Sequence, residues 1–353
     1  MQAPILLMVA AASVALWSWL AAREKWQALA LLCPMLVPAA GVVLLYIWHD
    51  AYHPAASFGW LAWGLVFAVH LWSLRRLAGL LPANALSAAH VLGCWLIIGV
   101  LALELRYLLY VLSDHYNAWR WLGWAVLPSI YLLAMASPRN WPWPVRAYER
   151  EYRHLAALPL AVLMLGWFWL ANIASDGNAE PLPYVPLINP LELGLLFALF
   201  GVCRWLHNAL PHVPNGERLG WLPQVVAGAS LFALFTALVF RAAHHWSGVP
   251  YQLDLLLESM LVQAGLSIVW TLIALTLMIF GHLRSRREVW LVGAALIAVV
   301  VAKLFFVELG NRGGLERIVS FIGVGVLLLV VGYFAPLPPR HPATETEEEQ
   351  VSS

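Results

Sequence analysis

The chain has 353 residues, of which 62% are hydrophobic and only 11% are charged. Soluble domains contain about 45–50% apolar and about 25% charged residues, so this composition excludes a soluble globular enzyme. It also excludes a disordered chain, which would be polar and charged. The formal net charge of +1 provides no basic surface for nucleic acid. The composition therefore indicates one membrane-embedded body, and the 20 Trp residues are typical of a protein with two lipid–water interfaces.

Apolar runs long enough to cross a bilayer recur along the chain. A hydrocarbon core of about 30 Å needs about 20 apolar residues per helix, and short polar breaks separate about eleven such runs. The sequence thus predicts an all-α polytopic transmembrane helical bundle over residues 1–334, followed by a disordered acidic cytoplasmic tail at 335–353. The predicted spans are 3–22, 26–47, 56–74, 85–112, 117–136, 154–172, 189–209, 221–243, 256–283, 288–307 and 315–334.

Basic residues are distributed unequally between the two sides of this predicted bundle. Most of the 20 Lys and Arg residues fall on one side, and the positive-inside rule makes that side cytoplasmic. With eleven spans, the N-terminus is then outside and the C-terminus inside. The stretches 56–136 and 189–283 each hold three spans of the same orientation, with Arg106 or Arg241 near the outer end of the middle span. This pattern suggests a parallel repeat, and chance similarity is the alternative.

Ionisable side chains in or beside the spans concentrate toward the predicted outer side. Such groups are costly in hydrocarbon and usually face protein or a water-filled cavity. Lys303 is the only Lys inside a span, and Val-Val-Val-Ala precedes it. We therefore expect an outward-facing polar cavity that binds a substrate. The alternative is interfacial snorkelling and structural ion pairs, such as Glu104 with Arg241. The expected binding residues are Lys303, Glu308, Arg241, Glu104, Arg106, Arg317 and Glu258.

Two adjacent histidines are the candidates for catalysis. His244 and His245 lie at the outer end of a predicted span, where Gly248 and Pro250 predict that the helix ends. An imidazole pair at this position favours a general base or a ligand pair, and a capped helix end is the alternative. No metal site and no cofactor are expected. The three Cys residues lack metal-ligand spacing, and no nucleotide-binding or hydrolase fingerprint is present.

Three further polar segments have open interpretations. Ser259, Gln263, Ser267 and Thr271 recur every four residues along one span, so they form a polar stripe that either lines a path or hydrogen-bonds to a neighbouring helix. The Pro-rich outer loop 175–189 is expected to pack over the outer side as a lid. The cytoplasmic loop 137–153 is expected to bind anionic headgroups through its Trp and Arg residues. His49, Asp50 and His53 after the second span are interpreted as interfacial polar residues rather than a metal site.

Five strings in the second half of the chain resemble a known family. They are PLPYVPLINP (181–190), HHWSGVP (244–250), QAGLSIVWTL (263–272), VAKLFFVEL (301–309) and RIVSFIG (317–323). Together they are similar to the bacterial multi-pass membrane family catalogued as domain of unknown function 2339. The resemblance is strongest from about 175 to 340 and implies that the chain corresponds to the C-terminal part of longer members. The family pattern commonly has Asp where Glu308 stands. The resemblance implies a bacterial membrane location and no established activity, so it assigns no catalytic residue.

Three functions remain open for this predicted multi-pass protein of the bacterial inner membrane. The favoured one is a transporter or a translocator of a lipid-linked substrate, with the outer polar cluster as its binding site. The second is an envelope-modifying membrane enzyme acting at the periplasmic face, with His244 or His245 as base. The third is a non-catalytic scaffold. The expected partners are membrane lipids, a small-molecule or lipid-linked substrate and other envelope proteins, but no nucleic acid.

Overall fold

The computed structural model describes residues 2–50, 53–113, 118–212 and 216–305, together with Val326 and Leu329. The chain divides into two compact units, Met1–Ala233 and Leu234–Ser353. Within the described ranges the regular structure is entirely helical. The prediction of an all-α membrane protein is therefore confirmed. The predicted tail, 335–353, lies outside the described residues.

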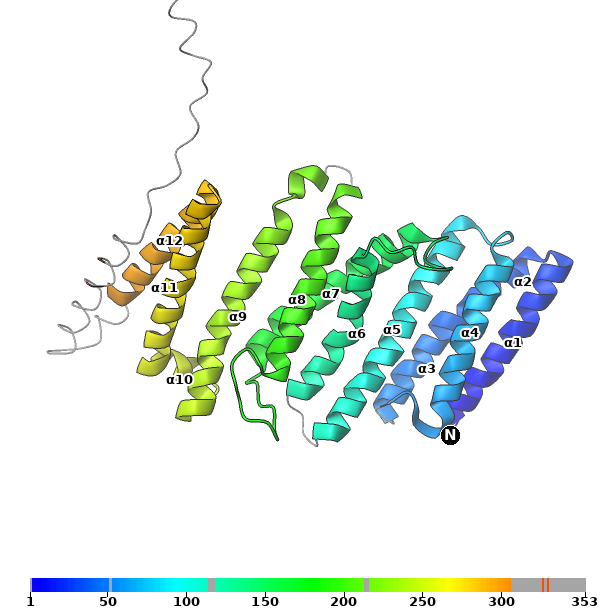
Figure 1. The fold of residues 1–353 in the computed structure, drawn as a ribbon. Helices are drawn as coiled ribbons and strands as arrows, with labels where there is room; N and C mark the ends of the chain where they lie inside the picture. The colour runs from blue at the N-terminus through cyan, green and yellow to red at the C-terminus, as the bar shows by residue number, and fades with distance from the viewer. Residues whose placement is uncertain are drawn as a thin grey trace, which may run out of the picture. The chain divides into compact units, whose positions relative to one another are not determined.

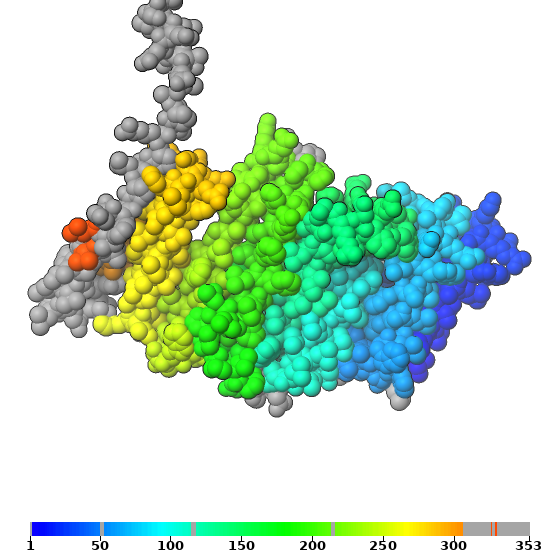
Figure 2. Space-filling view, viewed as in Figure 1, coloured from blue at the N-terminus to red at the C-terminus, as the bar shows by residue number. Residues whose placement is uncertain are grey.

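The first unit consists of long helices that follow one another along the chain (Figures 1 and 2). Short 3₁₀ turns or one π-helical turn, Glu151–Ala156, continue or connect several of them. The helices are α1 (Gln2–Glu24), α2 (Gln27–Leu32), α3 (Leu36–Asp50), α4 (Gly59–Leu77), α5 (Ala83–Ser113), α6 (Ala118–Ala136), α7 (Ala157–Ala174), α8 (Pro190–Ala209) and the first half of α9 (Leu222–Ser247). The 3₁₀ turns are Cys33–Met35, Ala56–Phe58, Leu210–His212 and Gly216–Leu219.

The second unit contains the rest of α9 and three further helices. These are α10 (Leu253–Glu258), α11 (Met260–Leu283) and α12 (Arg287–Lys303). Helices α11 and α12 pack closely along their length. A Cβ atom added at Gly293 of α12 would lie 2.7 Å from the Ala274 carbonyl oxygen of α11. Such a close approach of two backbones is typical of small residues between membrane helices.

Among the described residues, eight helical segments are long and apolar enough to cross a membrane. The long predicted span 85–112 is observed as α5, whose 31 residues extend about 46 Å, more than a bilayer core requires. Predicted span 117–136 is helix α6, with 19 residues including Arg120, and 288–307 contains α12, with 17 residues. Predicted span 315–334 lies outside the described residues apart from Val326 and Leu329. The eight segments are Gln2–Glu24, Gln27–His49, Ala56–Leu77, Ala83–Ser113, Glu151–Ala174, Pro190–His212, Gly216–Ser247 and Met260–Leu283.

The core of the first unit lies between its helices, and large apolar side chains also cover the outside. Leu7 of α1 and Leu74 of α4 are buried in one cluster, whereas Leu16 and Val42 are more than half exposed. An apolar exterior is expected of a surface that faces lipid, since lipid and core are equally apolar. Helices α5 and α6 approach closely at Gly123, where an added Cβ atom would lie 2.6 Å from the Arg106 Cα.

Candidate functional site

Lys303 ends helix α12, and its ammonium group lies against helix α11. Its Nζ donates hydrogen bonds to the Gln263 carbonyl oxygen at 2.8 Å and to the Ser267 Oγ at 2.7 Å. The Ser267 hydroxyl in turn donates to the same Gln263 carbonyl at 3.0 Å, and the Thr271 Oγ1 donates to the Ser267 carbonyl at 2.7 Å. The polar stripe predicted on this helix is therefore the surface that receives the Lys303 side chain.

Arg241 of α9 is fully buried, with no solvent exposure. Its level along α11 follows from two contacts made by residues that precede it on α9. Trp270 Nε1 donates to Thr236 Oγ1 at 3.1 Å, and a Cβ atom added at Gly265 would meet the Val239 Cγ1 at 2.8 Å. Since residue numbers rise on α9 as they fall on α11, the two helices are antiparallel. Arg241 is therefore level with the turn that begins at Gln263, where Lys303 also binds.

Glu258 lies just before this turn in the sequence, at the junction between α10 and α11. It ends α10 and is exposed. Ser259 has extended backbone angles and separates α10 from α11. The Gln263 Nε2 donates to the Leu257 carbonyl at 2.6 Å, so one residue of α11 both secures the short helix and provides a carbonyl to Lys303. Glu308 and Arg317, the remaining predicted residues of this cluster, lie outside the described residues.

His244 lies in the last turn of α9, and its ring is held by the loop that follows. The Nδ1 lies 2.7 Å from the Val249 carbonyl oxygen. Because a carbonyl can only accept, we assign the ring proton to Nδ1. Gly248 has a φ of +70° and turns the chain so that Val249 comes back to the helix, which places the end of the helix where the sequence predicted it. The His244 ring centroid lies 4.8 Å from that of His245.

The described residues contain no group of three or more His, Cys, Asp or Glu side chains placed to hold a metal ion.

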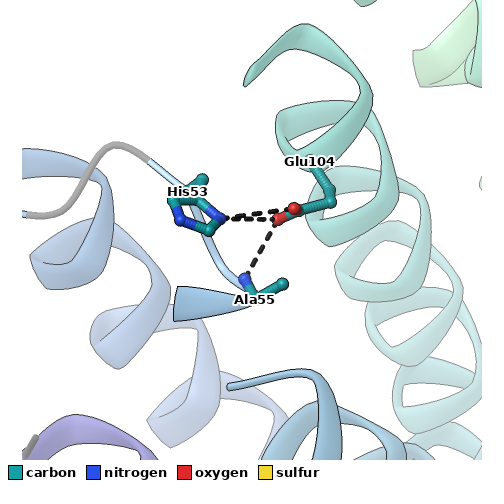
Figure 3. Close-up of polar contacts among 3 residues, drawn as sticks. All are labelled: His53, Ala55 and Glu104. Carbon is teal, nitrogen blue, oxygen red and sulfur yellow. Dashed lines mark hydrogen bonds and ion pairs between the residues drawn. The ribbon is translucent and has the colours of Figure 1, made fainter. Parts of the chain in front are cut away.

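Glu104 belongs to the first unit, where its carboxylate holds a loop against α5 (Figure 3). The Ala55 amide donates to Oε2 at 3.0 Å, and the His53 Nδ1 lies 3.3 and 3.4 Å from the two carboxylate oxygens. The His53 ring stacks on Tyr107, with centroids 3.9 Å apart. The neighbouring cation, Arg106, is buried and lies over the Trp124 ring at 5.2 Å. Sequence reasoning identified Glu104 as a polar residue but missed His53 as its partner.

Glu192 is a fully buried carboxylate that sequence reasoning missed altogether. It accepts hydrogen bonds from the Tyr184 hydroxyl, at 2.8 Å, and from the Leu187 amide. Asn189 caps the same helix, since its Oδ1 accepts from the Leu191 amide at 2.9 Å. An N-cap Asn followed by Pro190 and by Glu at the third helical position is a recognisable helix start, so this pattern was available in the sequence. Together these contacts hold the Pro-rich loop 175–189 on the end of α8.

Two of the predicted binding residues, Arg241 and Lys303, lie at the same level along α11, Arg241 by the register of α9 on α11 and Lys303 by its hydrogen bonds. Two others, Glu104 and Arg106, lie in the first unit, where loop and aromatic groups surround them. The Lys303 ammonium donates to a carbonyl and a hydroxyl oxygen of α11, and an ammonium makes stronger hydrogen bonds to an ionised acceptor such as a carboxylate or phosphate.

A family model described as predicted membrane protein, domain of unknown function 2339, matches residues 1–338. No curated protein matches the chain. No solved structure matches it either.

Proposed function

The chain belongs to the membrane-protein family catalogued as domain of unknown function 2339, and we propose that it is a transporter or a translocator of a lipid-linked substrate. In this proposal Arg241 and Lys303 bind an anionic group of the substrate. The observation that supports the proposal is that both cations lie at the level of the same turn of α11.

Electrostatics favours an anionic ligand at this turn. A cation inside a membrane helix is costly and usually faces a substrate path or a counter-charge. Arg241 is fully buried, and its guanidinium is a planar fork of N–H donors that matches carboxylate and phosphate. Placing Lys303 at the same level makes the local potential more positive, because screening by water is weak in a protein interior. An anion that enters this region is therefore attracted by both cations.

The depth of the two cations is consistent with a site that opens to one side. Arg241 lies six residues before the end of α9 at Ser247, which is about 9 Å along the helix. Lys303 lies sixteen residues beyond Arg287, the first residue of α12, which is about 24 Å. Both cations are thus near the membrane boundary opposite the basic turn Arg284–Arg287. The positive-inside rule assigns that basic turn to the cytoplasm, so the proposed site faces outward.

The hydrogen bonds from Lys303 to α11 can be replaced by hydrogen bonds from Lys303 to a substrate. Its described hydrogen-bond acceptors are a carbonyl and a hydroxyl oxygen, and hydrogen bonds from an ammonium to an ionised acceptor are roughly twice as strong. The Lys side chain has four flexible methylene groups, so its ammonium can move from α11 to a substrate without moving a helix. Ser267 and Thr271 then offer hydroxyl groups along the same face.

The test compares anionic metabolites and lipid-linked species in four strains that lack their own copy of the gene. One is left empty and the others carry the wild-type protein, Lys303→Met or Arg287→Met, and mass spectrometry measures what accumulates. We expect Lys303→Met to accumulate the same anionic species as the empty deletion strain. Arg287→Met removes the same charge at the basic end and should resemble wild type. A wild-type profile for Lys303→Met at normal membrane abundance would contradict the proposal. If Lys303→Met is poorly inserted, Lys303→Arg retains the charge and should restore the profile.

A second candidate function is an envelope-modifying enzyme, and the His244 geometry favours it. The hydrogen bond to the Val249 carbonyl holds the ring through Nδ1, which makes Nε2 the nitrogen that would act as base. The ring is thus oriented as in general-base catalysis. His244→Ala should then change the composition of the envelope, and His245→Ala, at the neighbouring position of the same helix end, provides the comparison. An unchanged envelope in both variants removes this candidate.

A further inference from the structure

Three exposed arginines, two at the end of α4 and one in the segment 137–150, are stacked on tryptophan rings. The Arg75 guanidinium carbon lies 5.5 Å from the ring centroid of Trp143, and that of Arg76 lies 5.2 Å from Trp72. In the same way Arg139 lies 5.4 Å from Trp141. Arg75 and Arg76 belong to the last turn of α4, and the third pair belongs to the segment 137–150. This segment lies across the ends of α5 and α6 in Figure 1.

The tryptophan rings of this segment are held in place by the helices beneath them. Trp141 Nε1 donates to the Ala134 carbonyl at 3.1 Å, and Trp143 makes an edge contact with the buried His90. Arg153 secures the start of the segment, because its guanidinium donates to the Met135 carbonyl at 3.0 Å and to two further carbonyls. The rings therefore form a fixed support rather than a mobile loop surface.

The stacked arginines differ from Arg153 in how their donors are used. Arg75, Arg76 and Arg139 are all exposed, and within the described residues none of their guanidinium groups makes a hydrogen bond or an ion pair. Stacking uses the face of a guanidinium and leaves its N–H edge available. Of the acidic side chains in this region, Glu151 accepts a hydrogen bond from Ser87 at 3.0 Å, and Glu149 is exposed.

We propose that these three Arg–Trp pairs form a binding site for the headgroup phosphate of an anionic phospholipid. The planar N–H edge of arginine matches two phosphate oxygens. Trp rings favour the headgroup region of the bilayer, and basic side chains at the membrane surface attract anionic lipids. The site lies at the end of membrane-spanning helices, where a lipid of the adjoining leaflet can reach it. By the positive-inside rule this is the cytoplasmic leaflet.

The experiment measures lipid binding to the purified full chain by native mass spectrometry, with phosphatidylglycerol as the probe and phosphatidylcholine for comparison. The variant Arg75→Gln/Arg139→Gln removes two stacked cations. Its matched control, Arg146→Gln/Arg150→Gln, removes two exposed arginines of the same segment that stack on no ring within the described residues. We expect the first variant to weaken phosphatidylglycerol binding about thirtyfold, since each basic group at the surface contributes roughly fivefold. The control variant should lose much less of its affinity for phosphatidylglycerol.

Two results would overturn the proposal. Equal losses in both double variants would mean that the segment attracts lipids only through diffuse charge, whereas competition by inorganic phosphate at the same concentration as lipid would mean that the site prefers the free ion. Trp143→Leu provides an independent arm, because it removes the ring and retains every charge. Trp143→Leu should weaken phosphatidylglycerol binding, as loss of the Arg75 charge does. The unfolding temperature in detergent is measured alongside to show that the variant is folded. Unchanged lipid binding in a folded Trp143→Leu protein contradicts a role for stacking.

Discussion

Buried charges are used differently in the two units of the molecule. In the first unit, carboxylates hold loops on helix ends, as Glu192 does for 175–189 and Glu104 does for the segment at His53–Ala55. In the second unit, Lys303 joins one membrane helix to the polar face of another. The first arrangement satisfies backbone donors that have no other partner, so the charge is structural. In the second, the Lys303 ammonium donates to a carbonyl and a hydroxyl oxygen, and under the proposed function it moves from these to an anionic group of the substrate.

This difference teaches that burial alone does not identify a functional charge. Glu192 and Arg241 are equally buried, but Glu192 accepts from a backbone amide and a tyrosine hydroxyl that would lose their partner without it. Removing such an acceptor costs the desolvation of each donor left behind. The predictions that follow test whether stability depends on the charges of the first unit and function on those of the second.

The largest loss of stability is expected from Glu192→Ala. The change leaves the Tyr184 hydroxyl and the Leu187 amide without their acceptor, so we expect a loss of about 3 kcal/mol in the free energy of unfolding. Thermal unfolding in detergent can be followed by labelling of the buried thiols Cys33 and Cys94. Glu180→Ala, at an exposed position of the same loop, should change stability by less than about 0.5 kcal/mol. Equal losses in the two variants would contradict a special role for Glu192.

The next largest loss of stability should be confined to the second unit. Gly293→Ala places a Cβ atom 2.7 Å from the Ala274 carbonyl and from the Met278 side chain, so α11 and α12 must separate, at a cost of about 2 kcal/mol. Hydrogen exchange should increase in α11 and α12 and stay unchanged in the first unit. Because Lys303 depends on this packing to reach Ser267, function should fall as well. Gly228→Ala is the control, since nothing lies within 4 Å of an added Cβ atom there.

A smaller loss is expected from Glu104→Gln. The amide oxygen still accepts from the Ala55 amide, but the interaction with His53 loses its charge. About a quarter of the Glu104 side chain is exposed, so solvent screening limits the loss to about 1 kcal/mol or less. Unfolding at high salt should reduce the difference from wild type further. A loss as large as that of Glu192→Ala would mean that Glu104 has an additional structural role.

The smallest effect on stability is expected from Lys303→Met. Replacing a buried charge by an apolar side chain of similar volume is often neutral or stabilising, so the free energy of unfolding should change by less than about 1 kcal/mol. Function should nevertheless be lost under the proposed role. If Lys303→Met destabilised the protein as strongly as Glu192→Ala, Lys303 would belong with the structural charges and the contrast between the two units would fail.

Much of the fold could be predicted from the sequence because a bilayer imposes a simple rule on composition. Apolar runs of about 20 residues must become helices, since unpaired backbone groups cannot enter hydrocarbon. The long helix α5, the tight turn after Glu24 and the helix end at Gly248 follow from this rule and from local residue preferences. The polar stripe of α11 was also predictable, because its period places four side chains on one face.

The partners of the site residues could not be predicted in the same way. Lys303 lies 40 residues from Gln263 along the chain, and His53 lies 51 residues from Glu104. Residues so far apart in the chain are not related by a helical repeat, so nothing in the sequence links one to the other. The stripe could equally have faced another helix, and Glu104 could equally have paired with a cation.

The sequence by itself determined that this chain is a helical membrane protein and roughly where its helices run, because transfer of side chains into hydrocarbon depends on local composition. Only the tertiary structure decided which charges meet: Glu192 with a loop, Glu104 with His53, and Lys303 with the turn of α11 that is level with Arg241. Helices in lipid pair through the shapes of their surfaces and through hydrogen bonds between distant segments. These surfaces come from the folded helices and cannot be inferred from any one stretch of sequence.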